Sequence, residues 1–259
     1  MRRHAGRFFL SLLGIVSSCA AVSAQGDYQV LRSFVEPAYP PAGRLLEVPS
    51  GRLFGVAERG GAHGLGALLA YDRQPDGTVI ATEVHAFGGS DGAGPMAGVI
   101  RGSDGALYGT TAGGGAENRG TVYRLGPDGA FSVLHSFTPN TGQAPGAELV
   151  EAGDGHLYGT TTGTGEPGTG TLFRITKAGA ITVLHVFDLD GWDPVDALLD
   201  GGDGKLYGIT RTGGRAESTV LNGAFYSITL DGTFTVLTTF ERPGPVNPAT
   251  ILDGGDGFL

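Results

Sequence analysis

Short β-prone runs, separated by turns and loops rich in glycine, follow one another along almost the whole chain. Outside the first 24 residues, no window of ten or more residues has the 3.6-residue apolar period of a helix. Asp-Gly between such runs predicts hairpin turns, because these turns need positive φ angles that glycine adopts freely. One stretch shows the order, with runs at 97–101, 106–111, 120–125 and 131–137. The pattern predicts an all-β protein.

The same order of runs and turns repeats along the chain at intervals of 49 to 54 residues, and two separate anchors keep that period. A Leu-aromatic-Gly anchor begins at Leu53, Leu107, Leu157 and Leu206. A second anchor closes the fourth run of each unit with phenylalanine, at Phe34, Phe87, Phe137, Phe187 and Phe240. Two anchors with one period indicate a tandem repeat.

Four strands in about 50 residues are typical of one blade of a kelch-like β-propeller. A lone four-stranded sheet leaves both faces in water, whereas stacked blades bury them. A β-helix has much shorter coils, and a β-sandwich has no reason to repeat. We predict a propeller of four-stranded antiparallel blades within residues 28–259. The expected complete blades are 44–87, 97–137, 147–187 and 197–240, with partial units at 28–34 and 249–259. The chain ends inside a predicted strand, so we expect a truncated member or an open ring.

The recurrent Leu-Tyr-Gly-Thr-Thr, Gly-Thr-Val-Tyr-Arg-Leu, Pro-Asp-Gly and Val-Leu-His-Ser-Phe segments resemble the GloVer-type tandem repeat. That repeat occurs in exported bacterial "choice-of-anchor" proteins. The resemblance covers about residues 28–259 and implies a repeat architecture. It implies no activity and no catalytic residues. Members often end in an anchoring tail, and this chain shows none.

The first 24 residues predict a signal peptide and therefore export. Three arginines precede the apolar run 8–16, and Val22-Ser23-Ala24 offers a cleavage site. A competing interpretation uses Val16-Ser17-Ser18-Cys19, which resembles a lipobox and would place a lipid anchor on Cys19. We expect a secreted, periplasmic or cell-surface protein. No later segment is apolar enough to cross a bilayer.

Glycine makes up 48 of 259 residues without a Gly-X-Y period, which excludes collagen and indicates many tight turns. The net charge of −9 and the scarcity of lysine argue against nucleic acid as a partner. The single cysteine, Cys19, excludes an internal disulfide framework and a cysteine metal site. We expect an extracellular ligand, either carbohydrate or protein.

The predicted blades have two unequal sides. Tight Asp-Gly turns follow the first and third strands, whereas long, variable loops follow the second and fourth. Because binding residues gather on loops held by a rigid scaffold, the loop side is the candidate ligand side. The candidate ligand-binding residues are Asp188, Asp190, Trp192, Asp193, Arg119, Arg211 and Arg215.

Two residue sets suggest chemistry, and each has a structural alternative. Three carboxylates, Asp188, Asp190 and Asp193, surround Gly191 and could hold Ca²⁺, although the distal glutamate of a calcium loop is missing. Trp192 in the same loop could stack on a sugar ring or pack between blades. Histidines recur in the fourth run at His85, His135 and His185. They fall in separate blades, which predicts a packing role and no metal site.

No catalytic triad order, phosphate loop or zinc spacing is present. The leading hypothesis is therefore a non-catalytic exported propeller that binds or scaffolds. One alternative is a carbohydrate-active hydrolase or lyase on the same fold. A second alternative is a structural repeat segment of a longer adhesin-like surface protein.

Overall fold

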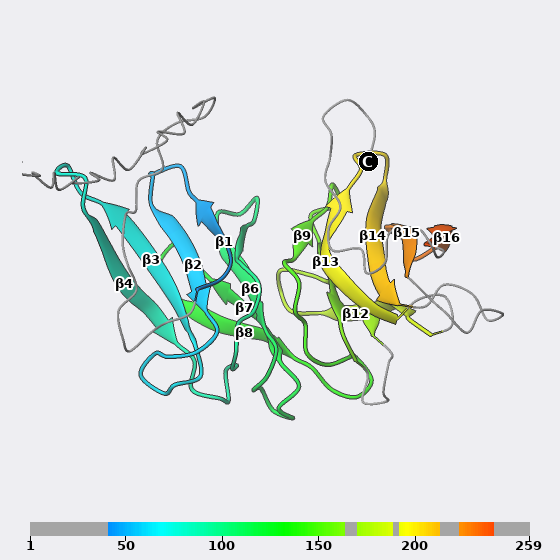
Figure 1. Ribbon diagram of the computed structural model, residues 1–259, viewed down its shortest axis with the longest axis horizontal. Helices are drawn as coiled ribbons and strands as arrows, with labels where there is room; N and C mark the ends of the chain where they lie inside the picture. Colours follow the sequence, from blue (N-terminus) through cyan, green and yellow to red (C-terminus); the bar gives the residue numbers. More distant parts are fainter. Residues whose placement is uncertain (1–40, 164–169, 189–191, 213–222, 241–259) are drawn as a thin grey trace, which may run out of the picture. The chain divides into compact units, whose positions relative to one another are not determined.

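The computed structural model describes residues 41–163, 170–188, 192–212 and 223–240, which form four antiparallel sheets (Figure 1). Each sheet has four strands, and they pair in chain order. We call the sheets blades 1 to 4. The all-β prediction of four complete, four-stranded blades is confirmed. The predicted leader 1–24 with Cys19 and the partial units 28–34 and 249–259 lie outside the described residues.

The first two blades span residues 41–136. Blade 1 contains β1 (Pro41–Glu47), β2 (Leu53–Ala57), β3 (Ala67–Arg73) and β4 (Val79–Ala86). Blade 2 contains β5 (Ile100–Arg101), β6 (Leu107–Thr111), β7 (Thr121–Leu125) and β8 (Phe131–Ser136). Within the described ranges, no helix has the length and apolar character needed to cross a membrane.

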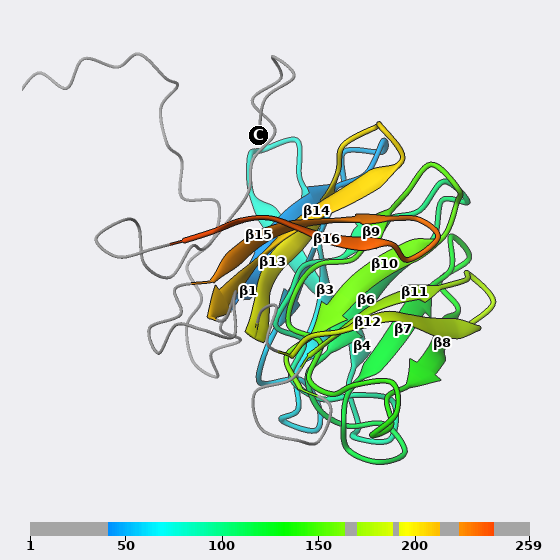
Figure 2. The same cartoon turned by 90° about the vertical axis from the view of Figure 1, so that its right-hand side faces the viewer.

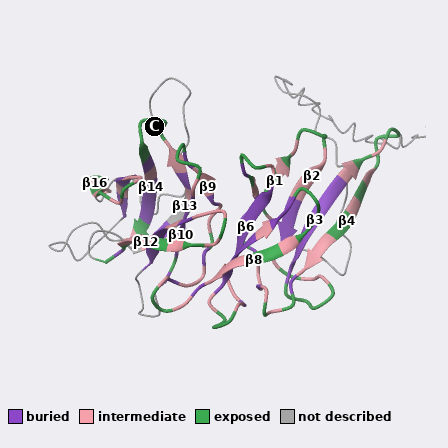
Figure 3. Cartoon of the chain, turned by 180° about the vertical axis from the view of Figure 1, so that it is seen from behind, coloured by how far each residue is buried: buried purple, intermediate pink, exposed green. Residues whose placement is uncertain are grey.

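The other two blades repeat this plan. Blade 3 contains β9 (Val150–Glu151), β10 (Leu157–Thr161), β11 (Thr171–Ile175) and β12 (Ile181–Val186). Blade 4 contains β13 (Trp192–Asp200), β14 (Lys205–Thr212), β15 (Ala224–Thr229) and β16 (Phe234–Thr239), which run from yellow to red in Figure 2. The second and third strands are the most buried, and β4, β8 and β12 are more exposed (Figure 3).

The Leu-aromatic-Gly anchor is explained by a close approach between neighbouring strands. Gly109 in β6 lies beneath the ring of Tyr123 in β7, and a Cβ there would come 2.5 Å from Tyr123 Cζ. Phe173 covers Gly159 in the same way in blade 3, where a Cβ would lie 2.7 Å from Phe173 Cζ. Burial raises the pKa of the Tyr123 hydroxyl. Glycine therefore recurs because an aromatic ring occupies the space of its side chain.

The Asp-Gly turn and the aromatic residue of the anchor belong to one structural unit. Asp104 Oδ2 accepts a hydrogen bond from the Tyr108 hydroxyl at 2.8 Å, and Asp104 Oδ1 accepts from Ala106 N–H. The same aspartate–tyrosine contact measures 2.7 Å at Asp154 and 2.8 Å at Asp203. In blades 2, 3 and 4, the turn after the first strand is thus tied to the second strand of the same blade.

The blades pack through three hydrophobic clusters, one for each pair of consecutive blades. In blades 1, 2 and 3, the phenylalanine after the fourth strand is fully buried against a third-strand aromatic ring of the following blade. The ring centroids of Phe87 and Tyr123 are 5.2 Å apart, and those of Phe137 and Phe173 are also 5.2 Å apart. The second anchor of the repeat is therefore a contact between blades.

The recurrent histidines also join blades. The His85 ring stacks on Phe131 of the following blade, with centroids 3.5 Å apart and the planes 8° from parallel. His185 stacks on Phe234 at 3.8 Å. Among the residues that the structure describes, no three His, Cys, Asp or Glu side chains gather to hold a metal ion. The stacked rings of His85 and His185 therefore take part in packing between blades.

Candidate functional site

The loops between blades share one backbone path. The residue before the loop proline has a left-handed φ in three loops, at Gly94 (61°), Ala144 (51°) and Asp193 (56°). The proline then packs on a glycine of the neighbouring loop, as Pro145 does on Gly120, where a Cβ would lie 2.8 Å from Pro145 Cδ. The backbone of these loops is thus repeated, so the loops differ mainly in the side chains at equivalent positions.

Threonine pairs hold these loops to the blades. Thr111 and Thr121 share a hydrogen bond of 2.8 Å between their hydroxyls, and Thr121 Oγ1 donates to the backbone oxygen of Asp91 at 3.1 Å. Thr161 and Thr171 repeat the pair at 2.9 Å. The scaffold on the loop side is therefore fixed by buried hydroxyls.

An ion pair joins the first strands of blades that are not neighbours. Arg44 Nε in β1 of blade 1 donates to Glu148 Oε2 at 2.6 Å, just before β9 of blade 3. The Glu148 side chain is only 10% exposed, whereas Arg44 is 76% exposed. The carboxylate lies against Gly98 of blade 2, where a Cβ would collide with Glu148 Oε1. Three consecutive blades therefore meet at one carboxylate.

The residues of this pair occupy the same position of the repeat. Counting back from the Leu-aromatic-Gly anchor, Arg44, Gly98, Glu148 and Ala197 are equivalent in blades 1 to 4. A scaffold contact would keep one residue type there, as Asp104, Asp154 and Asp203 do in the turns. The position instead carries a cation in Arg44, no side chain in Gly98 and an anion in Glu148, and these three residues contact one another. We call Arg44, Gly98 and Glu148 the first-strand site.

Two of the loop residues singled out in the sequence form a pair. Asp193 Oδ2 accepts a hydrogen bond from Arg211 Nη1 at 2.6 Å, across the β13–β14 ladder. Asp193 stands where the other loops have Gly94 and Ala144, so its carboxylate is an addition to the common framework. Asp190 and Arg215 lie outside the described residues, as does the side chain of Trp192. Asp188 is exposed just after β12.

Arg119, the remaining loop candidate, contacts Gln143 in the next loop and not the aspartates near Gly191. Its Nη1 donates to Gln143 Oε1 at 2.5 Å, and its Nε lies 3.8 Å from Glu117 Oε2. The equivalent residue in blade 1 is Leu65, which has no charge. Three of the four described loop candidates thus lie in two separate pairs, Asp193 with Arg211 and Arg119 with Gln143.

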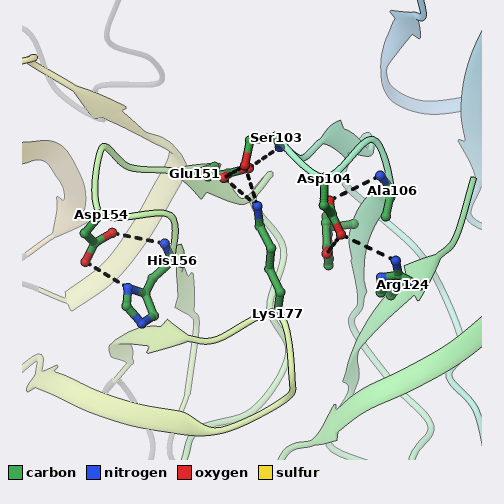
Figure 4. A network of polar contacts seen from close by, with 9 residues as sticks. Ser103, Asp104, Ala106, Arg124, Glu151, Asp154, His156 and Lys177 are labelled. Carbon is green, nitrogen blue, oxygen red and sulfur yellow. Dashed lines mark hydrogen bonds and ion pairs between the residues drawn. The ribbon is translucent and has the colours of Figure 1, made fainter.

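A second polar network lies on the side of the tight turns (Figure 4). Lys177 Nζ donates to Ser103 Oγ at 2.7 Å and to Glu151 Oε1 at 2.6 Å, linking the turns of blades 2 and 3. A serine beside a lysine resembles a nucleophile with its base. The Glu151 carboxylate, however, stabilises the protonated amine, and Ser103 itself donates to Glu151 at 2.6 Å. The network therefore stabilises the contact between blades 2 and 3.

Partial burial disfavours the charged form of Glu151, but the hydrogen bonds from Lys177 and Ser103 outweigh burial and lower its pKa. We expect Glu151→Gln to lower the free energy of unfolding by about 1–3 kcal/mol at pH 7. A carboxylate with a lowered pKa stabilises the fold fully above its unfolded pKa of about 4.3. The difference between variant and parent should therefore shrink as the pH falls through the lowered native pKa.

Urea unfolding at pH 7 and at successively lower pH measures this difference. The matched control is Glu117→Gln, since that side chain is 47% exposed and pairs only loosely with Arg119. We expect the control to change the unfolding free energy by less than about 0.5 kcal/mol at any pH. A Glu151→Gln effect that persists unchanged in acid would contradict the assigned ionic contact.

Sequence reasoning missed the first-strand site. The repeat alignment itself contained a signal, because equivalent positions of the first strand differ in charge while the turns beside them do not. The pairing of Arg44 with Glu148 was not visible, since 104 positions separate them. Only the stacking of blades brings them together.

The sequence matches the Gloeobacter/Verrucomicrobia repeat over residues 40–259, and the chain belongs to that family. The expected GloVer-type resemblance is thereby confirmed. A comparison with curated protein sequences finds no match.

Solved structures of similar fold include several enzymes. One, titled a putative gluconolactonase, has a TM-score of 0.51 and 20% identity over 83% of this chain and 68% of that chain. A GH43 β-1,3-galactosidase has a TM-score of 0.47 and 11% identity, over 78% of this chain and 46% of its own. A GH43 enzyme from Xanthomonas citri, complexed with xylotriose, has 0.44 and 14%, over 83% and 79%.

These comparisons correct the leading hypothesis from the sequence. The expected non-catalytic binding or scaffold module is wrong as the main interpretation, because a solved structure of this fold is titled a putative gluconolactonase. At 20% identity or less, the likeness itself establishes the propeller fold alone. The likeness therefore assigns no activity to this chain.

Proposed function

We propose that this chain is an exported carbohydrate-active enzyme, a hydrolase or lyase, that works at the first-strand site. The observation that carries the proposal is Glu148, whose side chain is 10% exposed and bound by Arg44. The other blades have different residues at this position of the repeat, so a shared structural role does not explain the carboxylate. A positioned carboxylate can take or give a proton in a transition state. Export, through the leader 1–24, is part of the proposal.

Arg44 suits a role in substrate binding. Its Nε donates to Glu148, while the Arg44 side chain is 76% exposed. Guanidinium N–H groups form planar, paired hydrogen bonds with sugar hydroxyls or carboxylates. The pairs Asp193–Arg211 and Arg119–Gln143 add further hydrogen-bonding groups of the same kind on the loop side. These groups support a polar, anionic or hydroxyl-rich substrate.

The make-up of the first-strand site favours the lyase form of the proposal. Glycoside hydrolases place two carboxylates on either side of the scissile bond. Within the described ranges, the ionic partner of Glu148 is a cation and not a second carboxylate. In an elimination, the Glu148 carboxylate would remove the proton beside a sugar carboxylate, and the C–H electron pair would form a C=C bond. The glycosidic C–O pair would leave with the oxygen, which takes a proton from the protonated Glu148 or from water. Arg44 would neutralise that sugar carboxylate.

We expect Glu148→Gln to lower kcat/KM by about 100-fold or more, because it removes the proton-transfer group without changing the size of the side chain. The assay offers neutral glycans, polyuronates and sugar lactones to the purified chain. New reducing ends report hydrolysis, and ultraviolet absorbance of an unsaturated product reports elimination.

Glu117→Gln is the matched control, since Glu117 is an exposed loop acid remote in sequence from the first-strand site. Its activity should equal that of the parent chain. A folded parent chain that converts none of these substrates would refute the proposal. Full activity in Glu148→Gln would remove Glu148 from it.

A further inference from the structure

The side of blade 4 that faces away from blade 3 carries the residues of a blade interface. In blades 2 and 3, the corresponding side chains are fully buried under the following blade, namely Tyr108, Tyr158, Val122, Leu172, Phe137 and Phe187. Their counterparts in blade 4 are Tyr207, Phe225 and Phe240, and all three are partly exposed. We call this surface the blade 4 outer face.

Leu237 on this face lacks the cover that the equivalent leucines of blades 2 and 3 have. The equivalent leucines, Leu134 and Leu184, are covered by the tight turn of the next blade, where Gly179 and Gly232 lie. A Cβ on Gly179 would come 2.5 Å from the backbone oxygen of Leu134. Leu237 is 46% exposed. The blade 4 outer face therefore has the residues of a blade interface, but no described blade packs against it.

The face is also ordered for packing. The rings of Tyr207 and Phe225 stack with centroids 6.0 Å apart and planes 22° from parallel. The Tyr207 hydroxyl is tied to Asp203 at 2.8 Å, which turns the ring body toward its neighbours. Ile209 beside them is only 3% exposed. An apolar, ordered sheet face of this kind marks an interaction site.

The chain itself contains a segment that matches the missing cover. Residues 251–259, Ile-Leu-Asp-Gly-Gly-Asp-Gly-Phe-Leu, repeat residues 198–206, Leu-Leu-Asp-Gly-Gly-Asp-Gly-Lys-Leu, in all but two positions. In blade 4, Leu198 and Leu206 are 5% and 0% exposed and pack in one cluster with Tyr158 and Leu172 of blade 3. Ile251 and Leu259 hold the same two positions of the repeat.

We propose that residues 249–259 dock on the blade 4 outer face as the first strand and turn of a fifth blade. Ile251 and Leu259 then cover Tyr207 and Phe225, as Leu198 and Leu206 cover Tyr158 and Leu172. The proposed contact concerns Tyr207 and Phe225, whereas Leu237 and Phe240 correspond to Leu184 and Phe187, which contact a later turn and the third strand of the following blade. This docking also adds Thr250 to the row of positions that holds Arg44, Gly98 and Glu148. It does not depend on the proposed enzymatic activity.

Paired cysteines test the docking in the full chain, because the only natural cysteine is Cys19. In a Cys19→Ser background, Phe225→Cys with Ile251→Cys should form an intrachain disulfide under mild oxidation. The positive control is Leu172→Cys with Leu198→Cys, the equivalent pair between blades 3 and 4. The negative control is Val122→Cys with Ile251→Cys, since Val122 is fully buried between blades 2 and 3.

We expect the test pair to cross-link within the chain to at least half the yield of the positive control. A disulfide between chains, seen as a dimer on a non-reducing gel, would assign the face to a second copy and overturn the proposal. No cross-link of the test pair, with a cross-linked positive control, would also overturn it.

A second measurement avoids any demand on disulfide geometry. Phe225→Cys alone, again with Cys19→Ser, is labelled with a thiol reagent under native conditions. Docking should slow the labelling at least tenfold relative to the same chain carrying Ile251→Asp as well, because a charge cannot replace Ile251 in an apolar contact. Equal labelling rates in the two chains would refute docking of this segment.

Discussion

Phe137→Ala is expected to lower the free energy of unfolding by about 3–5 kcal/mol, the range for removing a buried aromatic side chain. Phe137 is fully buried in the cluster that joins blades 2 and 3, with its ring 5.2 Å from that of Phe173. The loss combines apolar surface returned to water with a cavity at the junction. Chemical denaturation, followed by far-ultraviolet circular dichroism, measures the change.

The repeat provides a matched control for this variant. Phe240 has the same sequence position as Phe137, but it is only partly buried and no described blade follows it. Phe240→Ala should therefore cost about 1–2 kcal/mol, since partial burial gives a smaller transfer term. Equal losses in the two variants would show that contacts within a blade, and not between blades, make this phenylalanine important.

Gly109→Ala is expected to lower the free energy of unfolding by about 3 kcal/mol, at the upper end of the usual cost of overpacking. The new Cβ would lie 2.5 Å from Tyr123 Cζ and 3.0 Å from Val99 Cγ1, and Tyr123 is fully buried, so neither neighbour can withdraw into solvent. The strands β6 and β7 would have to separate. Thermal and denaturant unfolding of the variant both measure the loss.

Gly153→Ala is the matched control for Gly109→Ala. A Cβ at Gly153 meets nothing within 4 Å, and its φ is not in the left-handed region. Alanine there should leave stability unchanged or raise it by about 0.4–1 kcal/mol, because it restricts the unfolded chain. A Gly109→Ala variant as stable as Gly153→Ala would contradict the close packing of Tyr123 on β6.

The sequence-based prediction of the fold succeeded because each repeated motif has a local structural cause. Asp104 fastens the turn and Tyr108 within five residues, and Gly109 accepts the ring of Tyr123 from the adjacent strand. Short-range patterns of this kind are readable from spacing alone. Phe137 is likewise repeated because every pair of consecutive blades needs the same contact.

The candidate site was less predictable, for a physical reason. The loop acids and arginines were chosen because they lie on variable loops. Of the pairs that the described ones form, only Asp193–Arg211 could be expected from sequence spacing, because these two residues lie on adjacent strands. Arg44 and Glu148 belong to blades that are not neighbours, and their contact requires the small Gly98 between them. A pattern read within one repeat cannot contain a relation that spans three repeats. No catalytic set was visible within any single unit, which is why the sequence alone favoured a non-catalytic interpretation.

The contact between Arg44 and Glu148 has a consequence for cooperativity. Repeat proteins are usually described as linear arrays, in which each unit is stabilised only by the units before and after it, and partial unfolding can begin at either end. An ion pair that passes over blade 2 adds a coupling between second neighbours. Loss of blade 1 would leave a nearly buried carboxylate on blade 3 without its cation, which penalises partly unfolded states. The chain should therefore unfold more nearly as one unit than a linear array of four blades would.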